Sequence, residues 1–179
     1  SWMLTAEAQR LANAQAQYDG LRTAVVRADQ VYNEFSSGTP DATAYRRLMK
    51  MLYDKVADKA CAPRYLLLMG DCAWDNRMLS SAWRSATPYD YLLCYESDNS
   101  MSDTESYVME DYFGLLDDGE GADLLRDKPD LGVGRFPVTT VAQARVMVDK
   151  CIRFMSRQNA GAWKNIYCML GDDGDNNSH

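Results

Sequence analysis

The sequence predicts an α/β protein with a mainly parallel sheet. Strand-like apolar runs alternate with amphipathic helices, and two of these runs, residues 65–70 and 166–171, are followed directly by acidic residues. Strands that alternate with helices form parallel sheets, so their carboxyl ends meet at one edge, where open α/β folds place ligands and catalytic groups. With 179 residues, of which 46% are hydrophobic and 25% charged, the chain can bury a full core.

The first part of the chain is predicted to contain one strand between helices. Residues 5–18 carry apolar side chains near helical spacing, with Thr5 able to cap the helix and Gly20 able to end it. Residues 21–28 are β-branched at their centre and favour a strand. Residues 29–35 then favour a short helix.

A long amphipathic helix and a buried strand are predicted next. The triplet Thr39-Pro40-Asp41 supplies a capping hydroxyl, a proline for the first turn and an acid near the positive end of the helix dipole. Apolar residues then recur at every third or fourth position until about Lys59, so one face of the helix is expected to pack on the sheet. Residues 65–70 follow as an apolar strand.

The middle of the chain predicts a β-hairpin or an excursion from the main sheet. Residues 87–95 and 106–116 are aromatic and partly alternating, and the polar residues 96–105 separate them. Residues 117–129 are acidic and contain glycine, which predicts an exposed loop.

The final part of the chain returns to the alternation of strand and helix. Residues 131–137 are predicted to form a short strand whose glycines allow close backbone approach. Thr140 and Gln143 have the spacing of a capping box, which opens a helix through about Ser156. Residues 163–171 are predicted to supply the last strand.

Charge and hydropathy exclude several classes of function. The net charge of -7 disfavours nucleic acid or an anionic membrane as a partner, because those surfaces require clustered Lys and Arg. No apolar run approaches the roughly 18 residues that a membrane-spanning helix requires. The first residues lack the basic flank and apolar stretch of a signal peptide, so any targeting segment is expected to lie outside this chain.

The five cysteines form no C-x-x-C pair, which argues against a zinc site and against a dense disulfide framework. They are Cys61, Cys72, Cys94, Cys151 and Cys168. The last three lie in apolar runs and are expected to pack as small hydrophobic residues.

Two acidic clusters are candidate cation sites. Asp173, Asp175 and Asn177 alternate as the oxygen ligands of a calcium loop do, although Ser178 stands where such a loop has glycine. A solvated acidic loop at the sheet edge is the competing interpretation. The second cluster, for which a surface turn is the stronger interpretation, comprises Asp117, Asp118 and Glu120.

Cys72 and His179 form the Cys/His pair that the predicted strands place at one sheet edge, where a thiolate and its imidazole base could meet. His179 would be a poor base, because nothing after it in this sequence orients its ring. Gly132-x-Gly134 lacks the third glycine of a dinucleotide-binding fingerprint. Asp71 lacks the acid pair of a phosphoacceptor receiver domain.

Several segments together resemble the gingipain-type cysteine peptidases, and within that family they are most similar to the sortases of the type IX secretion system. The segments are, in order, residues 30–38, 39–43, 65–71, 110–114 (EDYFG), 132–137 (GVGRFP) and 172–176. The resemblance implies a caspase-like, three-layer α/β sandwich. It also implies that residues 1–160 form the first, non-nucleophile subdomain of a catalytic domain and that residues 161–179 begin the second, catalytic subdomain.

The resemblance also bears on the candidate residues. The family's catalytic histidine lies in a Gly-His-Gly motif and its cysteine ends the following strand, and this chain contains neither motif. Cys72 falls at a variable position after Gly-Asp, which further weakens a dyad with His179. The family's substrate-pocket acid falls at Asp175 or Asn176, and an asparagine there would argue against selectivity for a basic P1 residue.

The expected function follows from this resemblance. The chain is predicted to be an inactive fragment of a cysteine endopeptidase or sortase at the outer face of the bacterial outer membrane, which cleaves the C-terminal signals of type IX secreted proteins. Its expected partners are peptide or protein substrates and other secretion-system proteins, and it requires no cofactor. The alternative is a non-catalytic protein-binding or adhesion module on a caspase-like scaffold, with or without calcium.

Overall fold

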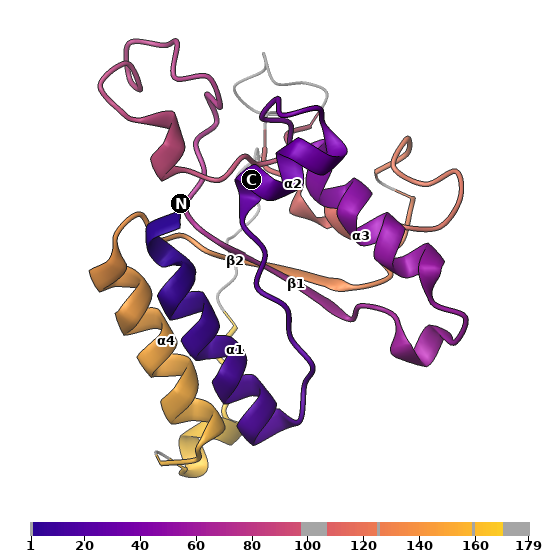
Figure 1. Ribbon diagram of the computed structural model, residues 1–179. Helices are drawn as coiled ribbons and strands as arrows, with labels where there is room; N and C mark the ends of the chain where they lie inside the picture. The colour runs from indigo at the N-terminus through magenta and orange to yellow at the C-terminus, as the bar shows by residue number, and fades with distance from the viewer. Residues whose placement is uncertain (1, 98–106, 125, 159, 170–179) are drawn as a thin grey trace.

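The computed structural model describes residues 2–97, 107–124, 126–158 and 160–169, which form a mixed α/β fold around a two-stranded parallel sheet (Figure 1). The helices are α1 (Thr5–Asp19), α2 (Ala28–Phe35), α3 (Thr43–Lys55) and α4 (Val141–Met155). The strands are β1 (Tyr65–Met69) and β2 (Gly132–Phe136). Short 3-10 helices are Trp2–Leu4, Lys59–Cys61, Pro88–Asp90, Glu110–Gly114 and Ala162–Asn165.

The register of the sheet decides which side chains share a face. Tyr65 pairs with Gly132 and Met69 with Phe136, so β1 and β2 run in the same direction and in step. Because side chains alternate along a strand, Leu66, Leu68 and Arg135 point to one face of the sheet. The opposite face carries the side chains of Tyr65, Leu67, Met69 and Phe136.

The two faces are packed by different helices, which gives the expected three layers. On the first face, Leu68 packs with Val31 of α2, Tyr45 of α3 and the fully buried Phe113. On the second face, Met69 and Phe136 pack against a cluster formed by the N-terminal segment and by the start of α4. The buried members of that cluster are Leu4, Val138 and Ala144.

Helices α1 and α4 lie side by side (Figure 1). Their polar contact is an ion-pair network in which Arg10 of α1 bonds both to Glu7 and to Asp149 of α4, and Arg145 of α4 reaches Glu7 at 3.5 Å. These ion pairs link α1 to α4 across their polar contact.

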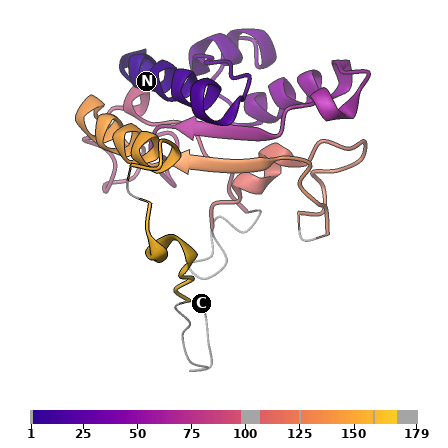
Figure 2. The same cartoon turned by 90° about the horizontal axis from the view of Figure 1, so that it is seen from below.

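Part of the second sheet face is not covered by these helices. A groove with a cavity volume of about 930 Å³ lies between the sheet and the C-terminal half of α4, and Tyr65, Leu67, Phe154 and Trp163 are among its lining residues. Beyond Trp163, residues 166–169 lead away from the sheet (Figure 2). This side of the fold therefore exposes apolar side chains.

Two predicted strands were wrong within the described residues. Residues 21–27 have no regular secondary structure, α2 already begins at Ala28, and Val26 is 52% exposed. Residues 162–165 form a 3-10 helix, and residues 166–169 have no regular structure, with Tyr167 90% exposed. An apolar or β-branched sequence becomes a strand only where a neighbour completes its hydrogen bonds, and no described segment pairs with either run.

The predicted helix starts differ in accuracy. The capping box of α4 is confirmed, because Gln143 N donates to Thr140 Oγ1 at 3.2 Å and Thr140 N donates to Gln143 Oε1 at 3.1 Å. Helix α3 begins at Thr43 rather than Thr39, because the Asp41 carboxylate accepts the Thr43 amide at 2.8 Å just before the first turn.

The excursion from the main sheet is confirmed, and it consists of residues 72–97 and 107–116. Its two arms meet in one antiparallel bridge between Glu96 and Val108, with hydrogen bonds from Ser97 N to Tyr107 O and from Met109 N to Tyr95 O. Each arm also contains a short 3-10 helix in place of paired strand residues, so the described part of the excursion is less regular than a long β-hairpin.

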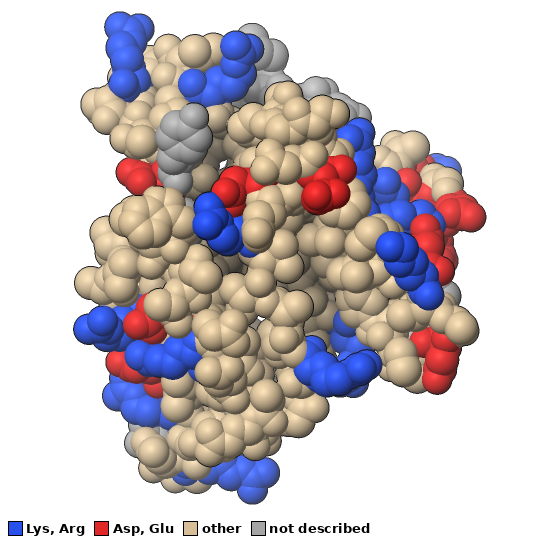
Figure 3. Space-filling model, viewed as in Figure 1, with Lys and Arg blue, Asp and Glu red and all other residues tan. Residues whose placement is uncertain are grey.

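Positive and negative side chains are interspersed on the face shown in Figure 3, with no basic patch over the sheet or the helices. None of the helices in the described ranges combines the length and apolar character that a bilayer crossing requires.

Gly70 forms the turn at the end of β1 and requires the absence of a side chain. Its φ of +157° is strained for other residues, and a Cβ atom built on it would lie 2.8 Å from Cγ of the buried Leu92. The close approach lets Leu92 N donate to Asp71 O at 2.8 Å, which joins the excursion to β1.

We expect Gly70→Ala to lower the free energy of unfolding by about 3 kcal/mol, because it adds overpacking to backbone strain. The matched control is Gly119→Ala, where φ is +90° but no atom lies within 4 Å of the new Cβ; its expected cost is about 1 kcal/mol. Urea unfolding of both variants measures the difference, and equal losses would contradict the role of Leu92.

Candidate functional site at the carboxyl edge of the sheet

The carboxyl ends of β1 and β2 meet the excursion at one edge of the sheet. Asp71 is the backbone junction, because its N–H donates to Val138 O at 3.1 Å and its carbonyl accepts from Leu92 N at 2.8 Å. Cys72 follows directly, and its own N–H donates to the Asp71 carboxylate at 2.9 Å. This edge is the site that the strand order predicts for functional groups.

Arg135 of β2 is the central side chain of this edge and is only 9% exposed. Its guanidinium donates to the carbonyls of Gly70 at 2.8 Å and Leu93 at 3.0 Å. It also forms a two-pronged ion pair with the carboxylate of Glu110, whose Oε1 and Oε2 accept from Nε at 2.9 and 3.0 Å and whose Oε1 also accepts from Nη2. One cation therefore joins both strands to both arms of the excursion.

The charge of Arg135 is maintained despite its burial. Burial alone would lower the pKa of this guanidinium, but the hydrogen bonds and the charge of Glu110 raise it above the ordinary value. A buried cation of this kind needs its anion, because an unpaired charge in a low dielectric is costly.

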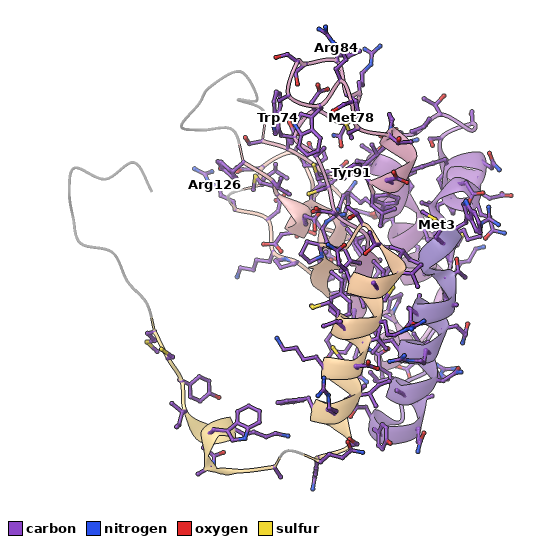
Figure 4. The ribbon with its side chains drawn as sticks, turned by 90° about the vertical axis from the view of Figure 1, so that its left-hand side faces the viewer. Met3, Trp74, Met78, Arg84, Tyr91 and Arg126 are labelled. Atoms are coloured by element: carbon purple, nitrogen blue, oxygen red, sulfur yellow. The ribbon has the colours of Figure 1, made fainter. Side chains whose placement is uncertain are left out.

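Aromatic contacts fix the excursion itself. Tyr95 and Tyr112, one from each arm, stack with ring centroids 3.7 Å apart, and Trp83 meets the edge of Tyr91 at 5.4 Å. Figure 4 shows Tyr91 in the same projecting part of the molecule as Trp74 and Met78. These contacts hold the segment that carries Cys94.

Cys72 and Cys94 are the two thiols of this edge. Interaction with the Cys94 thiol and, more weakly, the charge of Arg135 lower the pKa of the Cys72 thiol to about 7 against the opposing effect of burial. The same interaction and burial raise the pKa of the Cys94 thiol well above its usual range. Cys72 is therefore the more acidic thiol of the two.

The surroundings of Cys94 are polar. Its sulfur lies 3.5 Å from Ala73 O, 3.8 Å from Asn76 Oδ1 and 3.7 Å from Glu96 Oε1, and the Asn76 amide also contacts the Cys94 backbone. Burial raises the pKa of Glu96.

Nucleophilic catalysis by Cys72 would also need a base. The one histidine of the chain, His179, lies outside the described residues, and those residues therefore place no imidazole beside Cys72. The edge therefore lowers the pKa of a thiol but, within the described residues, lacks the partner that would shuttle protons during peptide cleavage.

The remaining candidates of the last loop also lie outside the described residues. They are Asp173, Asp175, Asn176 and Asn177. Calcium binding by Asp173, Asp175 and Asn177 stays a prediction. Substrate contact by Asp175 and Asn176 stays a prediction as well.

The second acidic cluster lies in an exposed turn, and Asp130 joins it. Carboxylate oxygens of Asp117, Glu120 and Asp130 lie within 4.8 Å of one another. Protein donors already bind them: the Tyr53 hydroxyl donates to Asp117 at 2.9 Å and to Asp130 at 3.2 Å. Asp118 instead pairs with Lys50 at 2.8 Å. The carboxylates thus hold the turn to α3.

Sequence reasoning missed Cys94, Arg135 and Glu110 as members of the edge. Arg135 and Glu110 both occur in the segments that carry the family resemblance. The available signal for Arg135 was that it is a lone charged residue inside an apolar, Gly-rich predicted strand. Cys94 gave no such signal, because its apolar surroundings in the sequence equally predict core packing.

Comparisons with known proteins assign the chain to a family. The family model described as Peptidase family C25 matches residues 1–179. The chain belongs to peptidase family C25. The resemblance to gingipain-type peptidases is thereby confirmed.

A solved structure supports the same conclusion. This chain is similar to the crystal structure of dimeric latent PorU from Porphyromonas gingivalis, with 43% sequence identity and a TM-score of 0.76. The match covers 95% of this chain. The chain spans 16% of the length of that PorU chain. No curated protein matches this sequence.

We expect Arg135→Met to lower the free energy of unfolding by about 3–5 kcal/mol, because it leaves the Glu110 carboxylate without its cation. Arg27→Met is the control, since Arg27 and Asp29 form an exposed pair and such pairs add little stability. Urea unfolding compares the two, and an Arg135→Met loss as small as that of the control would contradict the buried role.

We expect Cys94→Ala to return the pKa of Cys72 toward about 8.5, the value of a free cysteine. The thiolate fraction at pH 7 then falls, and alkylation of Cys72 by iodoacetamide slows roughly tenfold. Peptide mass spectrometry across pH 5–10 measures the rate, with the exposed Cys61 as internal control. An unchanged Cys72 profile would show that Cys94 does not stabilise the thiolate.

Proposed function

We propose that this chain is the first, non-nucleophile subdomain of a surface-exposed, gingipain-like cysteine endopeptidase or sortase. The catalytic histidine and cysteine lie in polypeptide that follows residue 179. The intact enzyme attacks a peptide carbonyl with a thiolate, forms a thioester, and passes it to water or an amine. By this proposal, its substrates are the C-terminal signals of proteins secreted by the type IX system.

One observation carries the proposal. The whole chain matches a cysteine peptidase family, yet the described residues place no imidazole beside the sheet-edge thiol of Cys72. A chain that spans 16% of PorU leaves ample room for a catalytic pair elsewhere.

The uncovered sheet face supports the proposed division into residues 1–160 and 161–179. Tyr65 of β1, Phe154 of α4 and Trp163 expose apolar surface around the groove, and residues 166–169 continue away from it. Apolar surface of this extent is normally covered by further protein. The second subdomain is the proposed cover.

A thiol-directed affinity label tests the location of the nucleophile. The intact protein is treated with a peptidyl acyloxymethyl ketone, which alkylates the active-site cysteine of such peptidases, and the labelled residue is mapped by mass spectrometry. We expect the label on a cysteine beyond residue 179, and we expect Cys72→Ser to keep kcat/KM within about twofold of wild type. Cys61→Ser is the matched control for replacement of a thiol.

Two results would overturn the proposal. A label on Cys72, with activity lost in Cys72→Ser but not in Cys61→Ser, would place the nucleophile in this chain. No labelled cysteine and no peptide cleavage in the intact protein would favour a binding or adhesion module.

A further inference from the structure

A closed turn in the excursion holds two large apolar side chains in solvent. The Asp75 carboxylate accepts the backbone N–H of Ser80 at 2.6 Å, and Met78 N donates to Asp75 O at 2.9 Å. Trp74, which precedes this turn, is 60% exposed, and Leu79 within it is 64% exposed. The bonds that close the turn therefore also keep both apolar side chains at the surface.

The turn is fixed to the rest of the excursion. Asn76 Nδ2 donates to Cys94 O at 3.3 Å, and Cys94 N donates to Asn76 Oδ1 at 3.4 Å. Met78 is buried and anchors the turn from inside, while Trp83 packs edge-on against Tyr91. A surface that is already held in one conformation loses little entropy when a partner binds to it.

Two exposed arginines flank these apolar side chains. Arg77 lies in the turn and Arg84 follows it. None of the ion pairs within the described ranges involves either guanidinium. The single acid of residues 72–86 is Asp75, whose carboxylate already binds backbone amides. This projecting part shows basic and no acidic side chains on the face seen in Figure 3, although the chain has a net charge of -7.

We call Trp74, Arg77, Leu79 and Arg84 the tip surface. Figure 4 shows Trp74 and Arg84 in the same part of the excursion, which projects beyond the sheet. A single exposed apolar side chain is ordinary, but tryptophan and arginine are enriched among the residues that dominate protein binding. Arginines without a carboxylate partner favour an acidic ligand, because they attract opposite charge and repel like charge.

The tip surface adjoins the carboxyl edge of the sheet. The hydrogen bond from Leu92 N to Asp71 O ties the excursion to the end of β1. Ligands of open α/β sheets bind outside the carboxyl ends of the strands. A protein held at this edge therefore has the tip surface within reach of its flanking residues.

We propose that the tip surface is an exosite for protein substrates. It binds an acidic segment that contains an aromatic or aliphatic residue and lies away from the scissile bond. Trp74 and Leu79 cover the apolar side chain, and Arg77 and Arg84 pair with the carboxylates beside it. The inference rests on the proposed function, because it adds a second contact for the substrate of the same peptidase.

Binding is measured with the intact protein and two fluorescein-labelled peptides, by fluorescence anisotropy. One peptide consists of Glu, Asp, Phe and Leu, and in the other Lys replaces both acids. The protein is first treated with the peptidyl acyloxymethyl ketone, so that an active site is occupied. We expect the acidic peptide to bind at least about tenfold more tightly than the basic one.

Two variants with matched controls locate the binding. We expect Trp74→Ala to raise the Kd of the acidic peptide at least about tenfold. Trp2→Ala is its control, because Trp2 is 73% exposed and lies outside the excursion. Arg84→Gln should weaken binding and reduce its salt dependence, whereas Arg22→Gln, at another exposed arginine, should change neither.

Cleavage of casein and of a short peptide that spans a mapped casein cleavage site gives a second readout. Because casein alone is long enough to contact both sites, we expect Trp74→Ala to lower the ratio of kcat/KM for casein to kcat/KM for the peptide about tenfold. In Trp2→Ala the ratio should equal that of wild type. A substitution that only disturbs the fold would lower both values together and leave the ratio unchanged.

The exosite is overturned by equal binding of the acidic and basic peptides, by an equal Kd in Trp74→Ala and Trp2→Ala, or by an unchanged kcat/KM ratio in Trp74→Ala. Loss of a dimer in Trp74→Ala on gel filtration would instead assign the tip surface to self-association and overturn it as well. Binding of the acidic peptide through Trp74 by a protein that cleaves neither substrate would refute the proposed peptidase function, and the exosite with it, while the binding surface itself would stand.

Discussion

The buried guanidinium of Arg135 is the interaction on which the geometry of the sheet edge depends. It is donated by β2, yet its partners are the carbonyl that ends β1, a carbonyl in the first arm of the excursion and the carboxylate of Glu110 in the second. A two-stranded sheet has few ladder hydrogen bonds of its own. One planar cation with several donors therefore replaces contacts that a wider sheet would supply, because its fork can satisfy carbonyls and a carboxylate at once.

The same cation shapes the chemistry of the edge. Its positive charge favours the thiolate form of Cys72, and interaction with the Cys94 thiol lowers the pKa of Cys72 further. The result is a thiol more acidic than a free cysteine. Peptide cleavage needs more, since the leaving amine must receive a proton from an oriented acid. Within the described residues, this chain of a peptidase family thus carries a thiol of lowered pKa that has no imidazole beside it.

Local signals in the sequence predicted the elements that depend on local interactions. The capping box at Thr140 forms as expected, because its determinants lie within a few residues. The apolar strand β1 and the Gly-rich strand β2 also form as expected, and each is the pairing partner that the other requires. Residues 21–28 and 163–171 were predicted as strands from composition, but a strand also needs a partner, and composition does not say whether one is adjacent. The influence of Cys94 on Cys72 was unpredictable for the same reason: the two residues are 22 positions apart, and their segments are aligned by the long-range hydrogen bond from Leu92 N to Asp71 O.

The central claim is that the electrostatics of this edge serve structure and not peptide cleavage. The pH dependence of kcat/KM in the intact enzyme, compared between wild type and Cys94→Ala, tests it most directly, because this substitution changes the proton affinity of Cys72 and leaves any distant nucleophile untouched. The account predicts superimposable profiles with the same acidic limb. An acidic limb that moves to higher pH in Cys94→Ala would show that the Cys72 thiolate is the catalytic nucleophile.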